Sequence, residues 1–146
     1  MDQNTLVSRN EKDGRRLTRA LKKNSRFGLV ASFWWFDPDS ERWSLVIASR
    51  LYRLQGPKAA YSSVAKQIAK LESKRTQGSF IGLGSVTIVS DEDPKVQAMG
   101  SAMRIEDSDA RIQSSNLNGV FVADALVYEL GRTISRDAIE SPIPAK

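Results

Sequence analysis

Positively charged side chains recur at helical spacing near the start of the chain. Five of them fall within nine positions, with no acidic residue among them: Arg15, Arg16, Arg19, Lys22 and Lys23. At about 100° per residue, these side chains and Arg26 share an arc of roughly 120°, opposite Leu17, Ala20 and Leu21. Lysine and arginine in such an arrangement can neutralise phosphate groups. The spacing predicts a helix over about 13–23, capped by Asp13, whose cationic face contacts a polyanion.

A second basic row follows on the clearest helix of the chain. Gly56-Pro57 is typical of a helix start, and an apolar stripe from Ala60 to Leu71 indicates the buried side. The row behind this stripe consists of Lys66, Lys70 and Lys74. These lysines add to the first surface only if the two helices share a side of the molecule. An ordinary solvated helix face is the alternative for both rows, and it fits the lysine row better, because the first row is more one-sided than solubility requires.

The net charge of +5 hides an uneven distribution. Residues 1–75 carry a net charge of +9, whereas residues 76–146 carry −4. Such a split suggests a polyanionic partner, self-association through opposite patches, or solubility alone.

Several kinds of catalysis are excluded by composition. The chain has no cysteine and no histidine, so it lacks thiol nucleophiles, imidazole bases and the usual zinc ligands. Three acids, Asp91-Glu92-Asp93, precede Pro94, where Asp93 as a helix cap is the first interpretation and a Mg²⁺ site the alternative. With no phosphate loop or nucleophile elbow, we expect no cofactor and lean toward a protein that is not an enzyme.

A central hairpin organises the predicted fold. Residues 27–49 form two apolar runs joined by Asp-Pro-Asp-Ser-Glu-Arg, which favours a turn between two strands. We expect its aromatic side chains to be mainly core, with Trp43 opposite Trp34 or Trp35. Residues 50–55 are expected to continue the second strand into a loop.

Further strands are predicted at 80–90 and 111–115, with a short helix from Pro94 to about Met103 between them. Asn118-Gly119 indicates a hairpin turn into 120–130, a run that would also fit a helix. The order is αββαβαββ, an α+β two-layer sandwich with a mixed or antiparallel sheet of about five strands and two or three helices. We expect one domain over 13–130, a flexible segment 1–12 and a polar tail 131–146.

The longest apolar stretch, Phe27 to Phe36, is far shorter than the ~20 residues of a membrane span. No apolar segment typical of a signal peptide is present near Met1. We therefore expect a cytoplasmic protein with no membrane contact.

Three stretches carry a resemblance: Phe33-Trp34, the run from Trp43 to Ser49, and Gly56-Pro-Lys-Ala-Ala-Tyr61. Together they resemble a family of small bacterial proteins of unknown function, over about residues 13–130. The resemblance implies a bacterial or mobile-element cytoplasmic protein and supplies no activity.

Our leading hypothesis is a small binding protein that contacts nucleic acid without sequence preference, or an acidic protein surface, through its basic helices. One alternative is an accessory module of the toxin–antitoxin or mobile-element type, or a homo-oligomer, that pairs through the edge of the aromatic hairpin. Another is a Mg²⁺-dependent nuclease, whose acid-x-Lys signature has candidates in Glu72-Ser73-Lys74 and Asp93-Pro94-Lys95.

Overall fold

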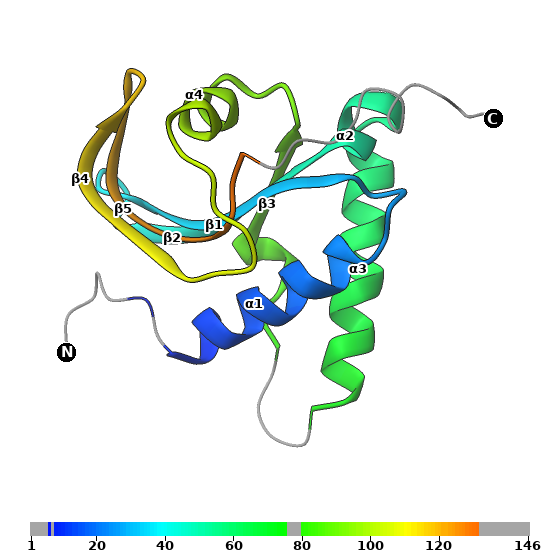
Figure 1. The fold of residues 1–146 in the computed structure, drawn as a ribbon. Helices are drawn as coiled ribbons and strands as arrows, with labels where there is room; N and C mark the ends of the chain where they lie inside the picture. The colour runs from blue at the N-terminus through cyan, green and yellow to red at the C-terminus, as the bar shows by residue number, and fades with distance from the viewer. Residues whose placement is uncertain (1–5, 7, 76–79, 132–146) are drawn as a thin grey trace.

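The computed structural model describes residues 6, 8–75 and 80–131, which form a mixed five-stranded sheet with helices on both faces (Figure 1). The strands are β1 (Leu29–Asp37), β2 (Arg42–Ser49), β3 (Val86–Ser90), β4 (Ala110–Leu117) and β5 (Val120–Glu129). The helices are α1 (Ser8–Lys22), α2 (Arg50–Gln55), α3 (Pro57–Ser73), α4 (Pro94–Ala102) and a 3₁₀ turn, η1 (Leu83–Ser85). The α+β class and the mixed five-stranded sheet are confirmed, whereas the expected two layers become three, because α4 packs on the face opposite α1 and α3.

The aromatic hairpin lies in the middle of the sheet, whose strand order is β3-β2-β1-β5-β4. Strands β2 and β3 are parallel and are connected through α2 and α3, whereas the other neighbours are antiparallel. Both β1 and β2 therefore have a strand on each side. Most of the hairpin is therefore paired on both sides, which argues against the alternative in which another chain pairs along its edge.

The register of the hairpin differs from the prediction, because Trp43 lies opposite Phe36 rather than opposite either tryptophan. Strand β1 continues to Asp37, whose carboxylate accepts hydrogen bonds from Asp39 N and Ser40 Oγ at 3.0 and 3.1 Å. This side chain closes the turn one position later than the apolar pattern indicates. The Phe36 and Trp43 rings pack with centroids 5.3 Å apart.

Two cores lie on opposite faces of the sheet, because side chains alternate along each strand. Helices α1 and α3 cover the first face, where Trp34 and Tyr128 pack with Leu17 and Val64. Helix α4 covers the second face, toward which the β4–β5 hairpin curls in Figure 1, and its Met99 packs there in a core that includes Phe33 and Leu130. The aromatic side chains of the hairpin are largely core, as expected, although Trp35 is only half-buried and Lys95 Nζ lies 4.2 Å above its ring.

Helix α1 begins at Ser8, earlier than the sequence predicts, and Asp13 is not its cap. Asp13 lies within the helix, is buried, and forms an ion pair with Arg75 just beyond α3. The predicted flexible segment 1–12 therefore overlaps a helix at Ser8–Lys12, and its remaining residues, Leu6 apart, lie outside the described residues. The predicted tail likewise lies outside them beyond Gly131.

Helix α2 is absent from the predicted order. The Ser49 side chain caps it by accepting a hydrogen bond from Leu51 N at 3.0 Å, and Gly56 ends it with a φ of 91°. Ser49 and Gly56 thus delimit a six-residue helix where the sequence predicts an extension of the second strand. The region 120–130 is a strand, β5, as preferred over the helical alternative. Among the described residues, no helix is both long and apolar enough to cross a membrane.

Candidate functional site

A groove of about 470 Å³ runs between the solvent-facing sides of α1 and α3. The two helices contact each other on the first face of the sheet. The residues lining the groove are Arg16, Arg19, Ala20, Lys23, Asn24, Gln67, Lys70, Leu71 and Lys74. Five of these nine are cations and none is acidic, so the groove is a concave positive site.

Helical spacing explains why these cations face one another. Arg16 and Arg19 lie three positions apart on α1, and Lys23 follows directly after its last residue, seven positions from Arg16. Lys70 lies in the last turn of α3, and Lys74 is the C-cap of that helix. Residues at these separations lie on one side of a helix. The apolar sides of both helices are turned toward the sheet, which leaves their basic sides to converge over Ala20 and Leu71.

The structure brings together five of the eight residues that the sequence selects for polyanion binding. Lys70 and Lys74 do share a side of the molecule with α1, which was the condition for their contribution. Arg15 and Lys22 do not line the groove, and neither does Lys66, which is exposed elsewhere on α3. These three stay outside the candidate site.

Carboxylates from the C-terminal half neutralise the other side of the cationic arc. Arg15 forms an ion pair with Asp109, and Arg19 Nε lies 3.1 Å from Asp107 Oδ1. Lys22 Nζ donates a hydrogen bond to Glu129 Oε1 at 3.1 Å. The uneven charge of the two halves is thus partly compensated inside the molecule. Helical projection alone missed these acids, because they lie 88 to 107 positions away from Arg19 and Lys22 along the chain.

Glu129 anchors this neutralised side. Its side chain is fully buried, and Oε1 accepts hydrogen bonds both from Lys22 Nζ and from the backbone N–H of Asp107, each at 3.1 Å. Its other oxygen, Oε2, has no hydrogen-bond partner within the described part of the chain. One buried carboxylate therefore fixes the loop that carries Asp107 and Asp109 beside α1.

In the part of the chain that the structure describes, the cations that face the groove, apart from Arg19, lack acidic partners of this kind. Across residues 8–75 and 80–131, the side chains of Arg16, Lys23, Lys70 and Lys74 make no ion pair. Like charges on neighbouring helical turns repel by a few tenths of a kcal/mol per pair. A bound anion would remove this repulsion, so the groove combines a concave shape with uncompensated charge.

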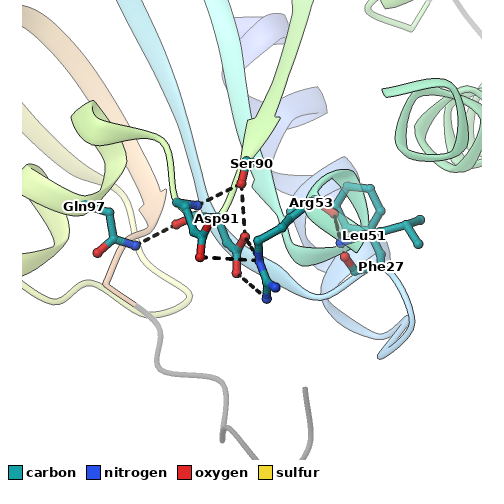
Figure 2. Close-up of polar contacts among 8 residues, drawn as sticks. Phe27, Leu51, Arg53, Ser90, Asp91 and Gln97 are labelled. Carbon is teal, nitrogen blue, oxygen red and sulfur yellow. Dashed lines mark hydrogen bonds and ion pairs between the residues drawn. The ribbon is translucent and has the colours of Figure 1, made fainter. Parts of the chain in front are cut away.

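The acidic turn Asp91–Asp93 is structural, as first interpreted (Figure 2). Asp93 caps α4 by accepting hydrogen bonds from Lys95 N and Val96 N at 3.1 and 3.3 Å. Asp91 accepts two hydrogen bonds from Arg53 of α2, at 2.9 and 3.2 Å. Figure 2 shows this pair beside Ser90, with the Gln97 amide donating to the Asp91 backbone carbonyl.

Metal-dependent nuclease chemistry finds no support at its two sequence candidates. Glu72 lies within α3, and Asp93 caps α4, so neither acid-x-Lys run stands at the end of a strand. Within the described residues, no group of three acidic side chains is placed to hold a metal ion.

No family model, curated protein or solved structure matches the chain. The resemblance to small bacterial proteins, and the cytoplasmic location that it implies, therefore stay predictions. The groove between α1 and α3 is the feature from which a function can be argued.

Proposed function

We propose that this chain binds the phosphate backbone of a nucleic acid in the groove between α1 and α3, without sequence preference. The observation that supports the proposal is the convergence of five cations on one concave surface that no acid lines. Phosphate neutralisation and release of the counterions is the dominant, sequence-independent part of nucleic-acid binding. The protein is then a binding module rather than an enzyme.

The dimensions of the groove suit a short stretch of backbone. Arg16 lies on α1, and Lys23 lies seven positions later, directly after the end of the helix, which corresponds to about 10 Å at a rise of 1.5 Å per residue. Neighbouring phosphates of one strand lie further apart than the ~3.4 Å rise per phosphate along the duplex axis, so about two phosphates fit this length. Lys70 and Lys74 approach the same stretch from the opposite wall.

The chemistry of the lining favours backbone contacts over base contacts. No aromatic side chain lines the groove, so it offers no platform for stacking bases. Its amides, Asn24 and Gln67, can donate hydrogen bonds to phosphate or sugar oxygens. We expect similar affinities for oligonucleotides of different sequence.

The test compares two double variants of the same helix that remove equal charge. Lys70→Gln with Lys74→Gln removes two groove cations, whereas Lys58→Gln with Lys66→Gln removes two exposed lysines outside it. Binding of labelled single-stranded and duplex oligonucleotides is measured by fluorescence anisotropy at several salt concentrations. The groove variant should bind more weakly, and its log-log salt slope should fall by about 1 to 2. Equal losses in both variants, or no binding by the wild type at low salt, would overturn the proposal.

A further inference from the structure

Arg19 belongs to two sites at once. It lines the groove between α1 and α3, and its Nε lies 3.1 Å from Asp107 Oδ1 on the loop before β4. The two side chains are 55% and 58% exposed, so solvent screens their attraction strongly. An anion that enters the groove therefore meets an arginine that already forms a weak ion pair with Asp107.

The position of Asp107 does not depend on this ion pair. Its backbone N–H donates to the buried Glu129 side chain at 3.1 Å, and Ser108 N donates to the Tyr128 carbonyl at 3.2 Å. On the other side of Asp107, Ile105 and Leu130 exchange two backbone hydrogen bonds of 2.8 and 2.9 Å. The backbone thus holds the Asp107 carboxylate beside Arg19 whether or not Arg19 binds it.

We infer that Asp107 is an internal competitor for the anion at Arg19, occupying this guanidinium when the groove is empty and giving it up to a phosphate. The inference rests on the proposed function and adds regulation to the same groove. A single anion that binds Arg19 only takes the place of the Asp107 carboxylate, so its net binding free energy is small. An extended polyanion reaches Arg16, Lys23, Lys70 and Lys74 in the same event, so the contact favours multivalent partners over isolated anions.

The neighbouring Asp109 supplies a matched control. It lies on the same loop and pairs with an arginine of α1. That pair is solvent-exposed as well, with both side chains about 40% exposed. Its partner Arg15 does not line the groove. Asp107→Asn and Asp109→Asn therefore make the same charge change and each break one surface ion pair, but only the first releases a groove cation. Asparagine also tolerates the positive φ of 43° at position 107.

The experiment measures binding of labelled oligothymidylate and of a duplex by the full chain across a salt series. Asp107→Asn should bind about two- to fivefold more tightly than the wild type, a gain typical of freeing one exposed charge. Its log-log salt slope should steepen by about 0.7 on the single strand and about 0.9 on the duplex. Asp109→Asn should change both quantities much less. In an Arg19→Gln background, Asp107→Asn should have no effect beyond that of Asp109→Asn.

Each result decides between the two proposals. If the wild type binds but the two loop variants behave alike, or if Asp107→Asn still tightens binding when Arg19 is glutamine, the inference is wrong and the proposed function stands. If neither the wild type nor Asp107→Asn binds, both are wrong. If the wild type binds, Asp107→Asn binds more tightly and Asp109→Asn does not, the carboxylate competes for Arg19 as inferred. Thermal unfolding of every variant checks that the fold is retained.

Discussion

Gly14 of α1 lies directly against the indole of Trp34 in β1. A Cβ atom added at Gly14 would stand 2.6 Å from Trp34 Nε1 and 2.7 Å from the Tyr128 hydroxyl oxygen. A glycine in the middle of a helix costs about 1 kcal/mol relative to alanine. Here it permits the close approach of α1 to the sheet, and so sets the position of the helix that carries most of the groove cations.

Gly14→Ala should therefore destabilise the protein although alanine is the better helix former. Overpacking of a core costs about 1 to 3 kcal/mol, so we expect a net loss of about 1 to 2 kcal/mol in the free energy of unfolding, measured by urea denaturation. Gly82→Ala is the control, since a Cβ there meets nothing within 4 Å. A stability equal to that of wild type in both variants would contradict the packing described for Gly14.

The adjacent tryptophans of β1 should respond very differently to truncation. Trp34 is 1% exposed in the core beneath α1, so Trp34→Ala should cost about 3 to 5 kcal/mol. Trp35 is half-buried on the other face, with Lys95 above its ring, so Trp35→Ala should cost clearly less. Urea denaturation of the two variants checks the order, and equal losses would argue against the faces assigned here.

The buried ion pair between Asp13 and Arg75 should be costly to break from one side. Asp13 is 1% exposed, and its Oδ2 has no hydrogen-bond partner within the described residues. Arg75→Met leaves this carboxylate buried without its cation, which typically costs about 3 to 5 kcal/mol. Adding Asp13→Asn should recover part of the loss, and the double-mutant cycle measures the coupling.

Arg104 provides the exposed counterpart of this test. It pairs with Glu106 at 3.2 Å, and both side chains are more than half exposed. Arg104→Met should change stability by only about 0 to 1 kcal/mol. A loss as large as that of Arg75→Met would mean that burial does not explain the difference between the two pairs.

The buried hydroxyl of Tyr128 should make the protein less stable at alkaline pH. Burial raises the pKa of its hydroxyl well above the ordinary value of 10, and the hydroxyl donates a hydrogen bond to the Glu11 carbonyl. Above pH 10 the unfolded chain releases a proton that the folded chain retains, so stability falls as pH rises, by up to about 1.4 kcal/mol per pH unit. Below pH 10 this contribution is fully present.

Tyr128→Phe should flatten that alkaline slope, although it also removes the hydrogen bond to Glu11. The comparison therefore uses the change in unfolding free energy between pH 9 and pH 11, not the absolute stability. An identical slope in the wild type and the variant would contradict the link between the buried hydroxyl and alkaline unfolding.

Much of the fold follows from patterns within single elements. The apolar alternation of β1 and β2 and the stripe on α3 predict these elements from local sequence alone. Helix α2 could not be predicted in this way, since a six-residue helix is too short to show a period and depends on the Ser49 cap. The register of Trp43 was also wrong, because the Asp37 side chain closes the turn.

The candidate site was predictable only in part. Helical spacing identifies both basic rows, but their meeting depends on how α1 and α3 pack on the sheet. The sequence also favoured α1 because its arc contains no acid, whereas the structure supplies three acids from distant positions: Asp107, Asp109 and Glu129. Which cations are compensated is therefore a tertiary property, and it separates Arg15 and Lys22 from Arg16 and Lys23.

The pairing of Lys22 with Glu129, 107 positions later, has a consequence for synthesis of the chain. Helix α1 leaves the ribosome before the sheet is made, and the strand that carries its buried counterion is the last of the sheet in chain order. At about 5 to 20 residues per second, roughly 5 to 20 s separate the two. Throughout this interval the nascent helix carries cations without their native counterions, so Lys22 gains its buried partner only when β5 emerges.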